Sequence, residues 1–246
     1  MRKEYIAVFD SGIGGISVLD RLVKQYSDND FIYFGDNNNA PYGNKDVAEL
    51  LSLTRRNIDA VSENGIKCIV LACNTLSVAV ADELGKYYSV PVFGVKPPVL
   101  CGASSANSVL FATVKTAEIY RKLLNIGNGT EIIALPNLAT AVERNAFNLS
   151  AVKLSEHISA ETLYKKFTTV ILGCTHYNLI EELFKKAYPQ SLIVSGIDET
   201  LEKIGLFLAK KQQPARSNRP RIVFRGDSAA FNCRFYKMFS RCESKI

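Results

Sequence analysis

Short apolar runs alternate with longer amphipathic segments along the whole chain, and this alternation restricts the fold more than any other feature. The short runs are rich in Val, Ile and Phe and are bounded by Gly, Asp and Asn, which is typical of buried parallel strands. Strict alternation of strands with helices predicts an α/β fold. The predicted strands are 5–9, 31–34, 68–72, 92–95, 109–112, 131–135, 170–172, 192–194 and 222–224, and the predicted helices are 16–25, 46–63, 76–86, 117–124, 179–186, 199–210 and 229–239.

The chain also repeats itself at a spacing near 101 residues. The matching segments are 9–11 with 111–113, 69–75 with 170–176, and 91–94 with 191–194. Three matches at nearly one offset predict two pseudosymmetric α/β halves that face each other. We expect each half to be a three-layer domain with a parallel-rich sheet.

The expected first domain comprises residues 1–95 plus 212–246, and the expected second domain comprises residues 96–211. The boundary follows from the segment after Gln212, which contains Pro214, Ser217, Asn218 and Pro220 and is typical of a connection. The final strand and helix are therefore expected to return to the first half.

Composition favours a soluble enzyme or binding protein over a membrane protein. Of the 246 residues, 47% are apolar and 22% are charged, and no stretch of 18 uninterrupted apolar residues occurs. The N-terminus has no apolar segment followed by a cleavage site, so we expect a cytoplasmic protein without membrane contacts. The net charge of +6 is concentrated near the C-terminus. A solvated basic face or linker is favoured there over a nucleic-acid site, because no nucleic-acid motif accompanies it. Its residues are Lys210, Lys211, Arg216, Arg219, Arg221 and Arg225.

The chain has six cysteines, at positions 68, 73, 101, 174, 233 and 242. None forms a C-x-x-C pair, so neither a zinc ribbon nor a thioredoxin-type site is indicated. In the cytoplasm these thiols are expected to be reduced. Cys68 lies inside an apolar run and is expected to fill the core.

Cys73 and Cys174 differ from the others because each follows a predicted strand and precedes a helix. Ligands of α/β sheets bind beyond the carboxyl ends of strands. The free N–H groups and positive end of a helix are expected to lower the pKa of a thiol there. Asn74, Thr75 and Thr175 add hydrogen-bonding groups at the same turns.

Three further features are candidates for the site. The turn at residues 10–15 (DSGIGG) follows a strand and opens a helix, so it can hold a carboxylate or another anion, or be only a tight turn. His176 lies two residues after Cys174 and is interpreted as its proton partner. The loop at residues 40–44 (APYGN) lies at the end of a strand, where loops often carry function. His157 is expected at the surface, and two scattered histidines do not predict a metal site.

These motifs resemble those of the glutamate racemase family, within the wider aspartate/glutamate racemase superfamily. The resemblance covers nearly the whole chain, through Gly226-Asp227. It rests on Asp10-Ser11-Gly12 with Gly14-Gly15, Pro41-Tyr42-Gly43, Cys73-Asn74-Thr75 and Gly173-Cys174-Thr175-His176-Tyr177.

The resemblance implies an active site at the interface of the two domains, with no pyridoxal phosphate, no other cofactor and no metal. One cysteine would remove the α-proton while the other delivers a proton to the opposite face. Asp10 would assist Cys73, and His176 with Glu143 would assist Cys174. The implied substrate-binding residues are Ser11, Pro41, Tyr42, Gly43, Asn74, Thr75, Thr113, Thr116 and Thr175.

Three departures from the family pattern leave both cysteine turns intact. The segment 94–98 reads GVKPP and lacks the family's acidic residue, Ala112 replaces a glycine, and Glu143 stands in an unusual context. The first hypothesis is racemisation of glutamate, supplying D-glutamate for peptidoglycan. The alternatives are a racemase for aspartate or another small amino acid, a catalytically silent ligand-binding homologue, and a redox role for the thiols. Because the family is often dimeric, a homodimer is also considered.

Overall fold

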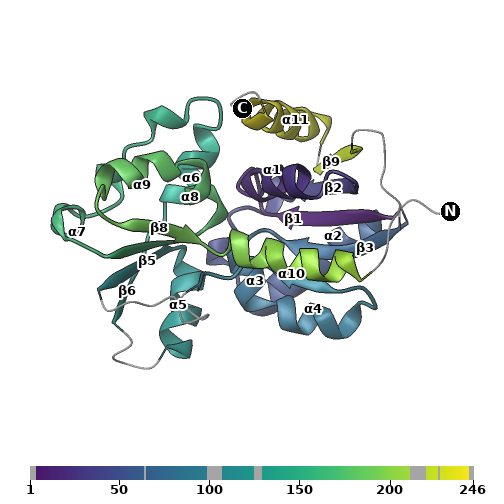
Figure 1. Ribbon diagram of the computed structural model, residues 1–246, viewed down its shortest axis with the longest axis horizontal. Coiled ribbons are helices and arrows are strands. Elements are labelled where there is room, and N and C mark those ends of the chain that lie inside the picture. The colour runs from purple at the N-terminus through teal and green to yellow at the C-terminus, as the bar shows by residue number, and fades with distance from the viewer. Residues whose placement is uncertain are drawn as a thin grey trace.

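The computed structural model describes residues 4–63, 65–98, 107–124, 129–210, 220–226 and 228–243. The chain forms two parallel sheets, each covered by helices on both faces, and the two units lie side by side (Figure 1). The predicted fold class is therefore confirmed. The N-terminal and C-terminal segments both belong to the unit drawn on the right, and the middle of the chain forms the unit on the left.

The first sheet has the strand order β4-β3-β1-β2-β9. Its strands are β1 (Tyr5–Asp10), β2 (Asp30–Gly35), β3 (Ile66–Leu71), β4 (Val92–Gly94) and β9 (Ile222–Gly226). One face packs against α1 (Ile16–Gln25), α10 (Ile197–Ala209) and α11 (Ala229–Glu243). The other face packs against α2 (Val47–Ser62), α3 (Asn74–Ala79) and α4 (Ala81–Tyr87). Because both faces are covered, the central strand β1 is buried along its whole length.

The second sheet has the order β6-β5-β7-β8. Its strands are β5 (Ser108–Ala112), β6 (Thr130–Ala134), β7 (Thr169–Gly173) and β8 (Leu192–Ser195). Helices α6 (Leu138–Arg144), α8 (Thr175–Leu179) and α9 (Glu181–Ala187) cover one face, and α5 (Val114–Leu123) covers the other. The short helix α7 (Ala160–Tyr164) precedes β7.

The two sheets follow one plan, as the sequence repeat predicts. The order β4-β3-β1-β2 corresponds strand for strand to β8-β7-β5-β6, and β9 is an addition at the edge of the first sheet. The register agrees as well: Phe9 pairs with Leu71 in the first sheet, and Phe111 pairs with Leu172 in the second. Strands β3 and β7, which precede the two cysteines, are therefore equivalent.

All nine predicted strands are present, but the helix predictions need correction. The predicted helices 76–86 and 179–186 each begin earlier and divide in two, because the buried residues Val80 and Ile180 leave the helical conformation. Their first turns carry Asn, Thr and His, so apolar periodicity does not reveal them. The sequence pattern does not indicate helices α6 and α7, since seven and five residues are too few for a clear period.

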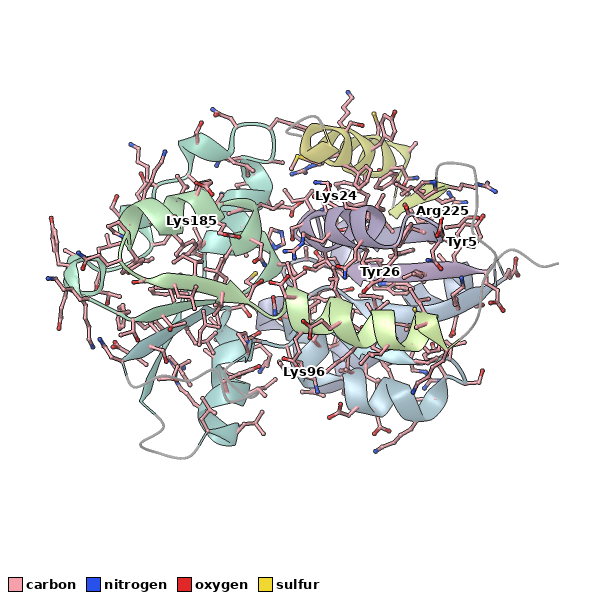
Figure 2. All side chains as sticks on the ribbon, viewed as in Figure 1. Tyr5, Lys24, Tyr26, Lys96, Lys185 and Arg225 are labelled. Atoms are coloured by element: carbon pink, nitrogen blue, oxygen red, sulfur yellow. The ribbon has the colours of Figure 1, made fainter. Side chains whose placement is uncertain are left out.

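Helix α10 lies in the expected second domain but buries its apolar face against the first sheet. Ile197, Leu201 and Ile204 belong to the same core cluster as residues of β1 and α1. The hydroxyl of Tyr26, at the end of α1, donates to the carbonyl of Leu201 at 2.6 Å, and Figure 2 shows Tyr26 between the two helices. These contacts favour placing α10 with the first sheet, and the domain boundaries stay a prediction.

Several sequence features fall outside the described residues. They are Cys101, Lys211, Arg216, Arg219, Asp227, the side chain of Cys242 and the connection expected after Gln212. Lys210, Arg221 and Arg225 are exposed, whereas Cys68 is completely buried in the core as expected. Within the described ranges, no helix combines the length and the apolar character needed to cross a membrane.

Candidate active site

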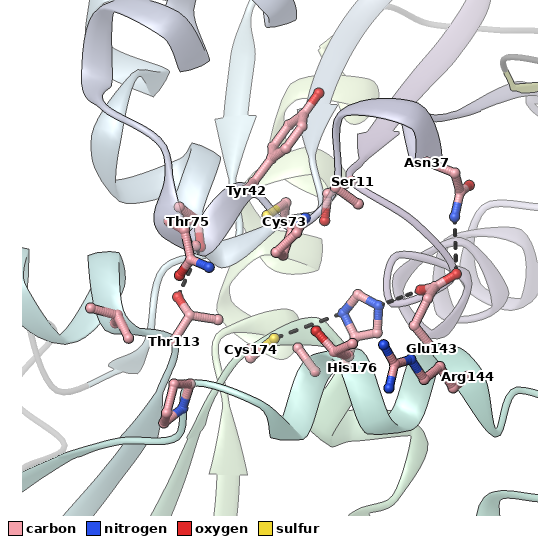
Figure 3. Close-up of a pocket in the computed structure, with 18 of the residues that line it drawn as sticks. Ser11, Asn37, Tyr42, Cys73, Thr75, Thr113, Glu143, Arg144, Cys174 and His176 are labelled. Atoms are coloured by element: carbon pink, nitrogen blue, oxygen red, sulfur yellow. Dashed lines mark hydrogen bonds and ion pairs between the residues drawn. The ribbon is translucent and has the colours of Figure 1, made fainter.

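A cavity of about 300 Å³ lies between the two units, at the carboxyl ends of their strands (Figure 3). The segments after β1, β2, β3, β5, β6 and β7 all contribute to it, together with α11. Loops at this end of parallel strands are where α/β proteins bind ligands. The lining residues are Ser11, Asn37, Ala40, Pro41, Tyr42, Gly43, Asn44, Cys73, Thr75, Thr113, Val114, Pro136, Ala139, Thr140, Glu143, Arg144, Cys174, His176, Phe231 and Arg234.

Cys73 and Cys174 enter this cavity from opposite sides. Cys73 is the residue before α3 in the first unit, and Cys174 is the residue before α8 in the second. Each is 6% exposed, and Figure 3 shows one on the upper wall and the other on the lower wall. A small molecule in the cavity would therefore have one thiol on each side.

The pKa of Cys73 contradicts the expectation of an activated thiol at a helix N-terminus. Burial, followed by the negative charge of Asp10, raises it to about 12. The backbone N–H groups of Thr75 and Leu76 act in the opposite direction but are outweighed. Without a ligand, Cys73 is therefore a protonated thiol, which suits it to donate a proton.

Cys174 has a different partner. Its Sγ lies 3.8 Å from Nδ1 of His176, and Nε2 of the same ring lies 2.6 Å from Oε2 of Glu143. Burial alone would lower the pKa of His176, but the hydrogen bonds with Cys174 and Glu143 raise it well above its usual value. The pKa of Glu143 is lowered, since its hydrogen bond with His176 outweighs burial. The predicted grouping of His176 and Glu143 around Cys174 is present.

Asp10 lies behind the cavity and contacts both units. The N–H of Gly12 donates to its Oδ1 at 2.9 Å, and the hydroxyl of Thr175 donates to its Oδ2 at 3.0 Å. Burial raises the pKa of Asp10, although the charge of His176 acts against this rise. Asp10 thus acts on Cys73 through its charge, while its Oδ1 holds the turn after β1 and its Oδ2 holds the turn that follows Cys174.

The glycine-rich turn after β1 binds carboxylates of the protein itself. The N–H of Ile13 donates to Oε2 of Glu143 at 3.1 Å, beside the bond from Gly12 to Asp10. A Cβ at Gly12 would lie 2.5 Å from Glu143, and one at Gly14 would lie 2.6 Å from both His176 and Thr175. Glycine suits both positions because side chains of the second unit lie directly against the backbone of the turn.

Three threonine hydroxyls meet on the other side of the cavity. Oγ1 of Thr75 lies 3.1 Å from that of Thr113 and 3.2 Å from that of Thr116, and the last two are 3.1 Å apart. Thr75 comes from the first unit and the other two from the second. Thr75 and Thr113 line the cavity, whereas Thr116 is completely buried behind them.

The loop containing Pro41, Tyr42 and Gly43 is fixed by a buried carboxylate. Asp36 is fully buried and accepts hydrogen bonds from the Tyr42 hydroxyl and from Asn57 Nδ2 at 2.9 Å. Burial, together with Asp36, raises the pKa of Tyr42, so its hydroxyl remains a donor. Gly43 faces Thr113, where a Cβ would lie 2.9 Å away.

Some of the expected site residues do not line the cavity. Besides Asp10 and Thr116, these are Asn74 and Thr175. Asn74 is buried and donates to the carbonyl of Val95 at 2.8 Å, so it holds the strand end rather than the cavity wall. The unusual Lys96 also lies away from the cavity and pairs with Asp82 at 3.1 Å. His157 is partly exposed and outside the site.

The structure adds cavity residues that the sequence did not suggest. Asn37 donates to Oε1 of Glu143 at 3.0 Å, and Arg234 lies 3.3 Å from the same oxygen. Arg144, Thr140 and Phe231 also line the cavity. Thr140, Phe231 and Arg234 lie outside the motifs, and no local pattern marks them, whereas Arg144 directly follows Glu143 and Asn37 precedes Pro41 by four positions. Within the described part of the chain, no three His, Cys, Asp or Glu side chains gather as ligands of a metal ion would.

Comparison with known proteins identifies the family. Residues 14–204 match the family model for the Asp/Glu/hydantoin racemases. A glutamate racemase from Campylobacter concisus is 32% identical over 212 residues, covering 81% of this chain and 80% of that protein.

Solved structures agree with this assignment. A glutamate racemase isoform from Bacillus anthracis superposes with a TM-score of 0.83 at 27% identity, covering 99% of this chain and 95% of that one. The glutamate racemase of Thermus thermophilus, solved with β-chloro-D-alanine, gives a TM-score of 0.80 at 27% identity, with coverages of 96% and 93%. The chain therefore belongs to the glutamate racemase family of Asp/Glu/hydantoin racemases and is an amino-acid racemase, an isomerase.

Proposed function

We propose that this racemase interconverts L- and D-glutamate by proton transfer between Cys73 and Cys174, without a cofactor. The observation that carries the proposal is the entry of the two thiols from opposite walls of one cavity. Inversion at Cα needs a base on one face and an acid on the other. A cavity of about 300 Å³ is at the small end for ligand sites, which suits a single amino acid.

In one direction, the thiolate of Cys174 takes the α-proton, and the C–H electron pair passes to the substrate's carboxylate. Cys73, protonated without a ligand, then donates its proton to the opposite face of Cα. The reaction leaves Cys174 as a thiol and Cys73 as a thiolate, and the reverse reaction exchanges their roles. Before this transfer, protonated His176, whose Nδ1 lies 3.8 Å from Cys174 Sγ, is placed to stabilise the thiolate with a hydrogen bond while keeping its own proton.

The remaining polar groups suit a substrate with two carboxylates and one ammonium. Ser11, Thr75 and Thr113 present hydroxyls to the cavity, and Arg144 brings positive charge to its wall. Charge-assisted hydrogen bonds of this kind would hold the substrate while the Cα–H bond is aligned with one sulfur. The relatives from Campylobacter concisus and Bacillus anthracis are named glutamate racemases, which makes glutamate the first substrate to test.

The proposal includes a cellular role. D-Glutamate formed in the cytoplasm would supply peptidoglycan synthesis, and expression of the chain should then restore growth of a bacterium that requires D-glutamate. A homodimer is a further part of the prediction, to be tested by sedimentation.

The direct test is incubation of the purified protein with single L-amino acids in buffer containing a chelator and no pyridoxal phosphate. Chiral chromatography should show conversion of L-glutamate to a mixture of equal parts, with aspartate and alanine converted far more slowly. If aspartate is converted faster than glutamate, aspartate is the preferred substrate and glutamate is not. No conversion of any of them would refute the proposed reaction.

A further inference from the structure

The Glu143 carboxylate is a meeting point of the two units. The carboxylate belongs to α6 of the second unit, and so does its partner His176 on α8. Its other donors come from the first unit. Ile13 N–H contacts Oε2 at 3.1 Å, while Asn37 Nδ2 and Arg234 approach Oε1 at 3.0 and 3.3 Å. Four groups from four separate segments therefore fix one carboxylate.

Arg234 holds Glu143 in two ways. Its guanidinium donates to the backbone carbonyl of Glu143 as well as facing the carboxylate. The Arg234 side chain is 26% exposed and that of Glu143 is 19% exposed, so water screens their interaction only in part. Arginine suits this position because its planar group can serve two acceptors at once.

The helix that carries Arg234 is firmly seated on the first sheet. Phe235, the next residue, is completely buried and packs edge-on against Tyr33 with ring centroids 5.2 Å apart. The hydroxyl of Tyr33 in turn donates to the carbonyl of Gly12 at 2.6 Å. Arg234 is thereby fixed relative to the glycine-rich turn that also contacts Glu143.

We propose that Arg234, supported by Asn37, is a positioning residue that holds the Glu143 carboxylate against His176, so that α11 forms part of the proton-transfer apparatus of Cys174. This inference rests on the proposed racemase mechanism. The guanidinium touches neither cysteine and acts through Glu143. Without Arg234, the Glu143 carboxylate would keep its hydrogen bonds from Ile13 and Asn37 but would lose the positive charge that α11 places beside it.

The test compares Arg234→Met, which removes the charge, with Arg234→Lys, which keeps it. Lys237→Met is the matched control, because Lys237 lies on the same helix three residues later and is exposed. We expect Arg234→Met to lower kcat about tenfold in both directions, with KM changed by less than about twofold. The acidic limb of the kcat profile should move to higher pH, because Glu143 loses the charge of Arg234 and then protonates more readily. Arg234→Lys should recover most of the loss, and Lys237→Met should match the wild type.

A second readout does not depend on activity. The chain contains two histidines, so the imidazole NMR signals of His176 can be assigned by comparison with His157→Gln. The acidic inflection of the His176 signal, which follows protonation of Glu143, should move to higher pH in Arg234→Met.

If the inflection of the His176 signal does not move in a folded Arg234→Met protein, the proposal is overturned, whatever the activity of the variant. A fall in kcat in Lys237→Met equal to that in Arg234→Met also overturns it. If the wild type does not racemise glutamate, the proposed function fails. The inflection then still decides whether Arg234 acts on Glu143.

Discussion

Nε2 of His176 lies 2.6 Å from Oε2 of Glu143, and this contact joins two groups whose pKa values are shifted in opposite directions. The raised value for His176 and the lowered value for Glu143 describe an ion pair held out of water, with side chains 8% and 19% exposed. Cys174 lies on the other side of the imidazole ring. The pair is therefore placed to control charge at one of the two thiols.

The pair predicts a defined dependence of stability on pH. Because the pKa of Glu143 is lowered on folding, its contribution is present above about pH 4.5 and is lost as the pH falls through the folded value. Because the pKa of His176 is raised, its contribution is present below about pH 6.5 and is lost as the pH rises through the folded value. Urea unfolding of wild type and Glu143→Gln should therefore differ most between these two pH values. Glu161→Gln, at an exposed position, should show no such window, and a pH-independent difference for Glu143→Gln would contradict the ion pair.

The high pKa of Cys73 predicts slow alkylation. In the unliganded enzyme at pH 7, iodoacetamide should modify Cys73 far more slowly than the exposed Cys233, and the rate should still rise above pH 9. Asp10→Asn should increase the rate at pH 8, because the charge of Asp10 is the second cause of the raised pKa. Peptide mass spectrometry measures both sites in one sample. Rapid modification of Cys73 at pH 7 would show that its thiol is already ionised.

The close approach at Gly14 predicts a severe effect of one methyl group. In Gly14→Ala, the new Cβ would lie 2.6 Å from His176 Nδ1 and Thr175 Oγ1, so the turn after Cys174 must shift. We expect kcat to fall by about 100-fold, since small misplacements of reacting groups have effects of this size. Gly85→Ala is the control, because a Cβ at this exposed helical position meets nothing within 4 Å. That variant should retain activity and gain about 0.5 kcal/mol in stability. Equal activity of the two variants would refute the role assigned to Gly14.

The cluster of threonine hydroxyls predicts a defect in substrate binding. Thr113→Val keeps the shape of the side chain but removes the hydroxyl that lines the cavity and lies 3.1 Å from Thr75. KM for glutamate should rise about tenfold with little change in kcat, as expected when binding is weakened equally in the ground and transition states. Initial rates measured over a range of glutamate concentrations separate the two constants. A fall in kcat with unchanged KM would assign Thr113 to proton transfer instead.

The sequence predicts the fold well because its strands are short, apolar and buried on both faces. The repeat also predicts the correspondence of Cys73 with Cys174, since equivalent strand ends carry equivalent residues. Helix α6, which supplies Glu143, is not predicted because its seven residues are too few to show a clear helical period of apolar residues. The sequence also does not predict the roles of Asn37 and Arg234, because these residues are separated from Glu143 by 106 and 91 positions.

The pKa of Cys73 could not be inferred from its place before a helix. That place supplies backbone N–H groups, which lower the pKa, but the sequence does not show the burial or the nearby Asp10 charge that outweigh them. The contact made by Asn74 could not be inferred from the sequence either. Because Asn74 is next to Cys73, contact with the substrate is expected, whereas its side chain donates to the carbonyl of Val95.

In the proposed mechanism, one cysteine serves each face of the substrate. Exchange of the α-proton of L- and D-glutamate in deuterated water, followed with Cys73→Ala and Cys174→Ala, tests this assignment. We expect that neither variant racemises glutamate and that each still exchanges the α-proton of one enantiomer, a different one in each variant. Racemisation by either variant, or exchange of the same enantiomer by both, would contradict it.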